Sequence, residues 1–149
     1  MSEFRSEAQL QQACVIYAKN SNPELYGKRL FAVFNEGRNV TVKLGVGLTA
    51  GVCDLLYVSP EGLLFGYELK LPGASHSVSH LKRQCQWMID VLPGRACFVD
   101  DLEMFKKVLS GDISAGISPV TVLNYLNRCK RNNIIWKSDG FNIAKEDKE

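Results

Sequence analysis

The sequence predicts a mixed α/β fold in which a mixed central β-sheet is flanked by helices. Segments with the composition of strands alternate with segments whose apolar residues recur at helical spacing, in the order α-β-β-β-α-β-α. A tight turn at residues 59–62 implies an antiparallel strand pair, and a strand–helix–strand crossover between Lys70 and Arg95 implies a parallel pair. With 149 residues, 46% of them hydrophobic, the chain can bury a core without disulfides or structural metal.

The first predicted element is a helix over residues 6–20. Ser6 followed by Gln9 matches a capping box, and apolar residues recur at helical spacing until an Asn-Pro pair ends the pattern. Residues 29–35 are strand-like. Residues 36–51 include four glycines, which predicts a long loop or an irregular edge segment.

The middle of the chain supplies the predicted centre of the sheet. Residues 52–58 and 63–70 have strand composition, and the Pro and Gly between them favour a hairpin. Apolar residues at steps of four, three and four then predict a helix over residues 79–92, which a Pro-Gly pair ends. Residues 95–99 predict a short apolar strand.

Two further helices are expected toward the C-terminus. Asp100 with Glu103 can cap a helix that runs up to a glycine, and Ser118-Pro119 starts another that continues to about Arg131.

The C-terminal segment is expected to extend this core. Residues 134–136 and 141–143 can pair as a hairpin across a Ser-Asp-Gly turn, and a charged, solvated tail follows. Such a hairpin would extend the sheet, form a dimer contact, or act as a wing beside a recognition helix. We therefore divide the chain into a core at residues 1–112 and a helix-and-hairpin extension at residues 113–149.

Composition and charge narrow the class of protein. The 18 basic and 16 acidic residues leave a net charge of +2, which neither indicates nor excludes nucleic-acid binding. Five scattered cysteines without a Cys-x-x-Cys pair predict reduced, buried thiols. No apolar run approaches the ~20 residues of a membrane helix, and the N-terminus lacks the apolar core of a signal peptide. We therefore expect a cytoplasmic protein without a membrane partner.

Two acidic residues and a lysine are predicted to meet at one end of the sheet. Asp54 lies in an otherwise apolar strand, where an ionised carboxylate is costly unless a cation or a set of donors compensates it. Side chains alternate along a strand, so Glu68 and Lys70 share one face of the next strand. Across an antiparallel hairpin, Asp54 and Glu68 can lie within a few ångströms of each other.

These residue types suit metal-assisted phosphate chemistry. Mg²⁺ prefers oxygen ligands and typically takes one or two protein carboxylates together with waters and phosphate oxygens. A divalent metal stabilises negative charge in a transition state, and a nearby lysine can orient water or neutralise that charge. The alternative interpretation is a surface hairpin with an ordinary Glu/Lys face.

An ordered set of motifs resembles a nuclease family. The motifs are Glu7 on the first helix, Asn35-Glu-Gly37, Gly51-Val-Cys-Asp54, Glu68-Leu-Lys70, and a helix that opens at Ser79 and carries Gln84-Cys-Gln-Trp87. Over about residues 5–110 this order resembles the VRR-NUC branch of the PD-(D/E)xK nuclease superfamily, with Cys53 in place of the usual proline. The resemblance implies a restriction-endonuclease-like core of order α-β-β-β-α-β.

The resemblance also implies roles for individual residues. Asp54 and Glu68 would bind Mg²⁺ or Mn²⁺, helped by the carbonyl of Leu69. Lys70 would position the attacking water, and Gln84 would support the site from the following helix. Without the resemblance, Gln84 is an ordinary solvated helix residue.

Glu7 and two histidines leave alternatives open. The resemblance implies that Glu7 adds an acidic group at the metal, whereas an exposed glutamate in a first helical turn is equally expected from the helix dipole. His76 and His80 are four residues apart, so one helical face can hold both, but no Cys or carboxylate stands at a zinc-like spacing. We expect them instead in a flexible loop near the path of a phosphate backbone.

Basic residues are expected to contact phosphates. One group surrounds the glycine-rich region, and a second occupies residues 128–137, which contain no acid. A solvated helix face is the alternative for the second group. The predicted contacts are Lys28, Arg29, Arg38, Lys43, His76, His80, Lys82, Arg128, Lys130 and Arg131.

The leading hypothesis is a Mg²⁺- or Mn²⁺-dependent deoxyribonuclease that hydrolyses phosphodiester bonds. The resemblance further implies a bacterial or phage enzyme that acts as a homodimer on branched DNA such as four-way (Holliday) junctions, whose symmetry a two-fold dimer matches. Two alternatives stay open. One is a non-catalytic nucleic-acid-binding or inhibitor protein on the same scaffold, and the other is a nuclease of linear DNA in repair or restriction.

Overall fold

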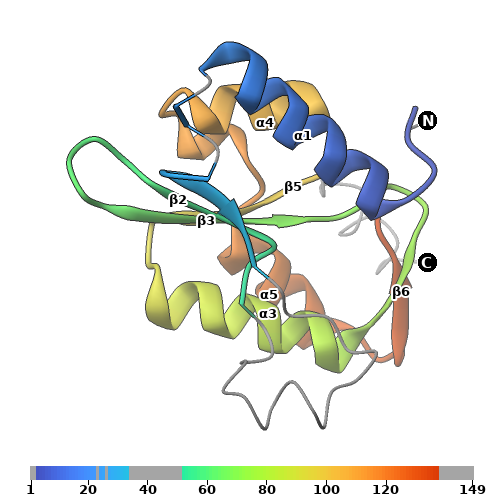
Figure 1. Cartoon of the computed structure of the whole chain (residues 1–149). Coiled ribbons are helices and arrows are strands. Elements are labelled where there is room, and N and C mark those ends of the chain that lie inside the picture. Colours follow the sequence, from blue (N-terminus) through green and yellow to red (C-terminus); the bar gives the residue numbers. More distant parts are fainter. Residues whose placement is uncertain (1–2, 23, 26, 34–51, 138–149) are drawn as a thin grey trace, which may run out of the picture.

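The computed structural model describes residues 3–22, 24–25, 27–33 and 52–137. In this part of the chain, helices lie on both sides of a four-stranded sheet (Figure 1). The elements are α1 (Glu7–Ser21), β1 (Leu30–Ala32), β2 (Leu55–Val58), β3 (Leu64–Leu69), β4 (Ser75–Ser77), α3 (Val78–Val91), β5 (Ala96–Val99), α4 (Leu102–Leu109), the 3₁₀ helix η2 (Ile113–Ala115), α5 (Pro119–Arg128) and β6 (Asn133–Ile135). The predicted mixed α/β class is confirmed.

The central sheet has the strand order β1-β2-β3-β5. β2 pairs antiparallel with β1 and with β3, while β3 and β5 run parallel. The predicted hairpin and the predicted parallel crossover are therefore both confirmed. In the hairpin Leu55 lies opposite Tyr67, so the preceding Asp54 comes next to Glu68.

Each face of the sheet is covered by its own pair of helices, α1 with α4 and α3 with α5 (Figure 1). Alternation along β3 divides its side chains between the two layers, because successive residues of a strand point to opposite faces. Tyr67 and Leu69 belong to the apolar cluster beneath α1 and α4. Gly66 faces the α3 layer, where an added Cβ would lie 2.8 Å from Cys53 Sγ, so glycine is required there. Glu68 shares this face.

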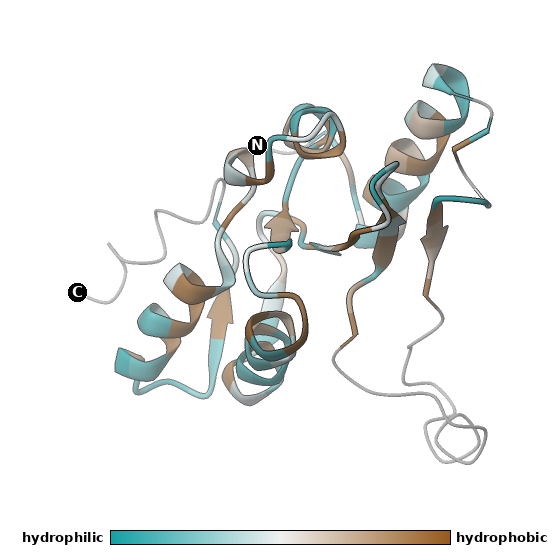
Figure 2. Ribbon diagram, turned by 90° about the vertical axis from the view of Figure 1, so that its left-hand side faces the viewer, coloured by the Kyte–Doolittle hydropathy of each residue, from teal (hydrophilic) through white to brown (hydrophobic). Residues whose placement is uncertain are grey.

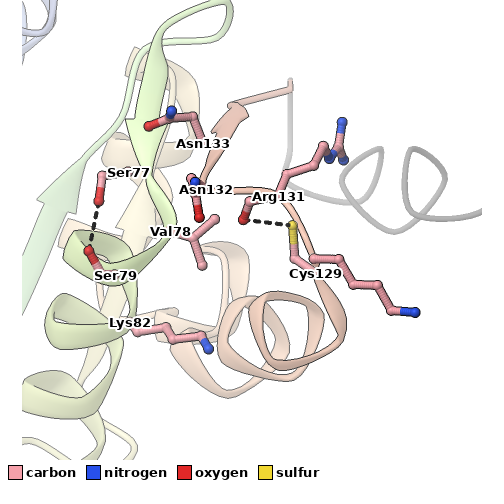
Figure 3. A pocket seen from close by; sticks show the side chains of 9 residues that line it. Ser77, Val78, Ser79, Lys82, Cys129, Arg131, Asn132 and Asn133 are labelled. Atoms are coloured by element: carbon pink, nitrogen blue, oxygen red, sulfur yellow. Dashed lines mark hydrogen bonds between the residues drawn. The ribbon is translucent and has the colours of Figure 1, made fainter.

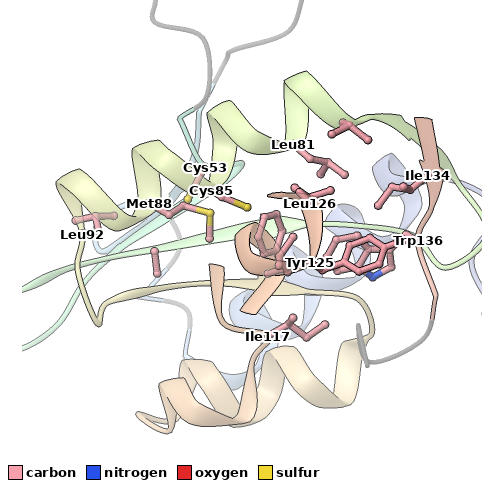
Figure 4. Packing of buried hydrophobic residues seen from close by; sticks show 14 residues of the cluster. Cys53, Leu81, Cys85, Met88, Leu92, Ile117, Tyr125, Leu126, Ile134 and Trp136 are labelled. Atoms are coloured by element: carbon pink, nitrogen blue, oxygen red, sulfur yellow. The ribbon is translucent and has the colours of Figure 1, made fainter. Parts of the chain in front are cut away.

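The hydropathy of the residues agrees with a buried sheet that is covered by helices on both faces. The strands of the sheet are mainly brown in Figure 2, and the helices carry both teal and brown residues. In the α3 layer, buried side chains from α3, α5 and the segment of β6 pack against the sheet, among them Leu81, Met88, Leu126, Ile134 and Trp136 (Figure 4). Residues of the expected extension at 113–149 thus share an apolar cluster with α3 and β5.

The predicted helix starts are partly confirmed. Ser6 accepts a hydrogen bond from the Gln9 amide at 3.1 Å, and Gln9 Oε1 in turn accepts one from the Arg5 amide at 2.7 Å. The prediction that Asp100 caps α4 is wrong, because Asp101 accepts from the Met104 amide at 2.7 Å. Asp100 is buried instead and accepts a hydrogen bond from the Trp136 indole.

The predicted C-terminal hairpin is not confirmed. β6 pairs antiparallel with β4, a strand that no hydrophobic alternation indicated, since its sequence is Ser-His-Ser. Residues 141–143, the other predicted half of the hairpin, lie outside the described residues. β6 therefore returns to a segment almost 60 residues earlier in the chain, between the end of β3 and the start of α3.

All five cysteines are free, and four of them are buried. Burial raises the pKa of Cys14, Cys85 and Cys97 to about 12. These thiols therefore pack as small apolar side chains, as predicted. Among the described residues, no helix combines the length and the apolar character needed to cross a membrane.

Candidate metal and nucleic-acid site

The two acids and the lysine meet where β3 ends. The Leu69 amide donates a hydrogen bond to Asp54 Oδ2 at 2.8 Å across the hairpin. Lys70 Nζ lies 3.5 Å from Glu68 Oε2. Glu68 and Lys70 are 3% and 2% exposed, whereas Asp54 is half-buried. The predicted convergence of these side chains is confirmed, and it occurs in a place almost closed to water.

Gln84 reaches the same point from α3. Its Nε2 donates a hydrogen bond to Glu68 Oε2 at 2.9 Å. Gln84 is buried rather than solvated, because it lies on the face of α3 that covers the sheet, together with Leu81, Cys85 and Met88. A side chain of α3 therefore orients one oxygen of Glu68, and Lys70, which directly follows β3, lies next to the same oxygen.

Burial and mutual repulsion disfavour the charged carboxylates. Burial, followed by the negative charge of Asp54, raises the pKa of Glu68 well above its usual range, although Lys70 opposes the shift. Burial also raises the pKa of Asp54, against the hydrogen bond from the Leu69 amide and the charge of Lys70. One lysine therefore does not compensate the acids of this site.

The incomplete hydrogen bonding of the buried Glu68 carboxylate is compatible with a bound cation. Glu68 Oε1 and Gln84 Oε1 are buried and have no hydrogen-bond partner within the described residues. Buried polar atoms without partners are uncommon, and a bound ion or water is one recognised reason for them. The available donors are oxygens, which suits Mg²⁺ or Mn²⁺.

The donor set also limits the kind of metal site. In the described part of the chain, no three His, Cys, Asp or Glu side chains lie close enough together to form a metal site on their own. What fits is a site of two carboxylates, Asp54 and Glu68, completed by a backbone carbonyl, water and phosphate oxygens, which is the pattern that Mg²⁺ favours.

Glu7 lies at the edge of this site, paired with a histidine. His76 Nε2 is 3.3 Å from Glu7 Oε2. Burial works to raise the pKa of Glu7, but the interaction with His76 and the positive charge of Lys70 outweigh it, and the net pKa is lowered. The backbone of Leu71 acts in the same direction.

The expectation for the two histidines is wrong in its geometry. His76 lies on β4 and is half-buried, whereas His80 is exposed in the first turn of α3, so no helical face holds both. Neither residue lies in a loop. Sequence reasoning also missed the contact between His76 and Glu7, and no local pattern signals it, because the two residues are 69 positions apart.

Three of the predicted phosphate contacts line one pocket (Figure 3). The pocket has a volume of about 440 Å³ and combines Lys82 of α3 with Lys130 and Arg131, which follow α5. Ser77, Ser79 and Asn133 also line it. The packing of α5 on α3 brings these cations together from segments almost 50 residues apart.

The other predicted contacts are dispersed. Arg29 donates hydrogen bonds to the carbonyls of Val58 and Ser59, at the turn end of the hairpin and away from Asp54. Lys28 forms an ion pair with Glu24 on the surface, and Arg128 is exposed at the end of α5. Residues outside the described ranges include Arg38, Lys43, Gly51 and the Asn35-Glu-Gly37 motif.

No protein-family model, curated protein or solved structure matches this chain. The geometry of the described residues is therefore the basis for assigning a function.

Proposed function

We propose that the protein is a Mg²⁺- or Mn²⁺-dependent endonuclease that hydrolyses DNA phosphodiester bonds, on a PD-(D/E)xK core of the VRR-NUC type. One observation carries the proposal. Asp54, Glu68 and Lys70 converge in a buried place at the end of β3, and one oxygen of Glu68 has no hydrogen-bond partner among the residues that the structure describes. A purely structural ion pair satisfies both of its oxygens, because an unsatisfied buried polar atom costs about 1–3 kcal/mol.

Asp54 and Glu68 would hold the metal, with the carbonyl of Leu69 as a further oxygen ligand. When bound, the divalent cation would supply a Lewis acid that stabilises the negative charge developing on the phosphate. The Leu69 amide fixes one oxygen of Asp54 at 2.8 Å and so orients its carboxylate. Gln84 does the same for Glu68, also through a single oxygen.

Lys70 would orient the attacking water and neutralise charge that builds up during attack. Its ammonium group has three donors and no acceptor, so it can contact Glu68 and still donate to water or to a phosphate oxygen. Because Lys70 is 2% exposed, its position is fixed before substrate binds. A fixed donor in a water-poor site stabilises charge more strongly than the same donor in bulk water.

The pocket lined by Lys82, Lys130 and Arg131 supports a DNA partner. Lys82 of α3 and the two cations that follow α5 would provide contacts for neighbouring phosphates of a DNA strand, on a different face of α3 from the buried Gln84. Such contacts contribute affinity without base specificity and weaken as salt concentration rises. We extend the proposal to branched DNA, and to a homodimer, because a two-fold assembly matches the symmetry of a four-way junction.

The test is cleavage of four-way junction, flap, duplex and single-stranded DNA in Mg²⁺ and in Mn²⁺. We expect the wild-type protein to cut the junction more rapidly than plain duplex. Lys70→Ala and Asp54→Asn should abolish cutting while circular dichroism shows an unchanged fold. The Asp54→Asn variant keeps an oxygen that can accept the Leu69 amide, so it removes the charge and preserves the hydrogen bond.

Matched controls separate the site from general charge effects. Glu61→Gln removes an exposed acid at the turn end of the same hairpin, and Lys107→Ala removes an exposed lysine of α4. Both should cut like the wild type. Undiminished cutting by Lys70→Ala or Asp54→Asn would overturn the proposal. Junction binding without any metal-dependent cutting would establish the binding-protein alternative, and equal cutting of plain duplex would favour a nuclease of linear DNA.

A further inference from the structure

We propose that His76 is a positioning residue of the metal site, which holds the Glu7 carboxylate at the edge of the site, where its negative charge acts on Lys70, Asp54 and Glu68. This inference rests on the proposed function. Neither the motif pattern nor the expected phosphate contacts assigned such a role to His76.

The contacts of Glu7 come from three separate segments. Its own helix places it in the first turn, directly after the Ser6 cap. The backbone of Leu71, one residue past Lys70, acts to lower the pKa of Glu7. His76 Nε2 lies 3.3 Å from Glu7 Oε2. Glu7 is thereby brought into electrostatic contact with Lys70, Asp54 and Glu68.

His76 is the more buried partner of this pair. Its side chain is 12% exposed, compared with 37% for Glu7. A glutamate exposed to that degree loses rotamer freedom when it is held in one place, so it needs a partner to stay at the site. His76 approaches Glu7 from β4 at ion-pair distance, and within the described residues neither Glu7 Oε2 nor His76 Nε2 has a hydrogen-bond partner.

The C-terminal segment fixes the strand that carries His76. In the pairing of β4 with β6, His76 lies opposite Ile134, which is buried. Backbone hydrogen bonds join Gly73 N to Trp136 O at 2.8 Å and Trp136 N to Ala74 O at 2.9 Å. The turn between Lys70 and β4 is thus tied to Trp136, whose indole is itself bonded to Asp100 at 3.0 Å. β6 therefore holds in place the strand that carries His76.

A group that orients an acid beside a metal alters metal affinity without binding the metal itself. Loss of such supporting groups typically weakens metal binding or activity about 10- to 100-fold. We therefore expect His76→Ala to weaken Mn²⁺ binding by about that factor. His76→Gln, which retains a donor at similar reach, should recover most of the loss. Ser75→Ala, at an exposed position of the same strand, is the matched control and should bind Mn²⁺ like the wild type.

The experiment has two readouts. Calorimetry with MnCl₂ gives the affinity of the wild type, His76→Ala, His76→Gln, Ser75→Ala, Glu7→Gln and the double variant Glu7→Gln/His76→Ala. If His76 acts through Glu7, the double variant binds Mn²⁺ no more weakly than Glu7→Gln alone. Urea unfolding of the metal-free proteins tests the contact itself, and we expect the two single substitutions to be non-additive there as well.

The outcomes separate this inference from the proposed function. If the wild type binds no Mn²⁺, the proposed function fails. If the wild type binds Mn²⁺ and His76→Ala binds it equally well, the positioning role fails while the proposed function stands. Additive losses in the double variant, or a His76→Gln variant as weak as His76→Ala, would also overturn the positioning role.

Discussion

Two buried carboxylates lie at the ends of the neighbouring parallel strands β3 and β5, and their surroundings differ. Asp100, which follows β5, is 1% exposed and accepts a hydrogen bond from the Trp136 indole at 3.0 Å. Glu68, near the end of β3, is 3% exposed, faces a second acid, Asp54, and has one oxygen without a hydrogen-bond partner in the described part of the chain. The first acid is used by the fold to tie down its C-terminal segment. The second lacks full compensation, which is typical of a site built for a ligand.

The largest effect is expected at Trp136, whose indole donates a hydrogen bond to the buried Asp100. Trp136→Ala removes a fully buried ring that packs on Phe98, with ring centres 5.2 Å apart, and it also removes the donor to Asp100. Large-to-small substitutions of buried aromatic residues cost about 3–5 kcal/mol. Urea denaturation followed by circular dichroism should show a loss of this size. A loss below about 1 kcal/mol would show that the contacts of Trp136 with Phe98 and Asp100 contribute little to stability.

The pH dependence of the free energy of unfolding should reveal the raised pKa values of Asp54 and Glu68. The folded-state pKa values of Asp54 and Glu68 are raised, so the native protein holds these protons more tightly than the unfolded chain, whose values are about 3.9 and 4.3. Their stabilising contribution is therefore complete below about pH 4 and is lost as pH rises through the folded-state values. For one such group the slope is at most about 1.4 kcal/mol per pH unit.

Urea midpoints of the metal-free protein between about pH 5 and 8 measure this slope. Glu68→Gln should flatten it and be more stable than the wild type at the upper end, because a neutral amide replaces a charge that burial and Asp54 disfavour. Stability curves of wild type and Glu68→Gln that run parallel over this range would contradict the electrostatic account of the site.

The smallest effect is expected far from both acids. Lys28 and Glu24 form an exposed i,i+4 ion pair, with side chains 70% and 74% exposed. Exposed ion pairs contribute about 0.2–1 kcal/mol, so Lys28→Ala should lower the free energy of unfolding by no more than that. If Lys28 also contacts a phosphate, the same variant should weaken DNA binding and reduce its salt dependence, which fluorescence anisotropy measures. A stability loss above about 1 kcal/mol would assign the lysine a structural role.

The centre of the fold could be predicted from sequence because its signals are local. The hairpin of β2 and β3 follows from two apolar runs and a Pro-Gly turn, and its register places Asp54 beside Glu68. The crossover to β5 follows from the helical spacing of α3. Within the site, the positions of Glu68 and Lys70 follow from strand alternation alone.

The remaining features depend on contacts between distant segments, and sequence patterns do not report these. β4 is three polar residues long, and its partner β6 comes almost 60 positions later. Asp100 and Asp101 are chemically equivalent as caps, and only the position of Trp136 decides that Asp100 is buried and Asp101 caps α4. The burial of Gln84 and the pairing of Glu7 with His76 likewise depend on how α1, α3 and β4 pack together.

The most direct test of the metal site is a calorimetric titration of MnCl₂ into metal-free wild type, Glu68→Gln and Asp100→Asn. Asp100→Asn retains an oxygen that can accept the Trp136 indole, so it removes a buried charge at the structural acid and preserves the hydrogen bond. We predict saturable binding by the wild type and by Asp100→Asn, and none by Glu68→Gln. Equal binding by wild type and Glu68→Gln, or no binding by the wild type, would contradict the assignment of Asp54, Glu68 and Lys70 as a metal site.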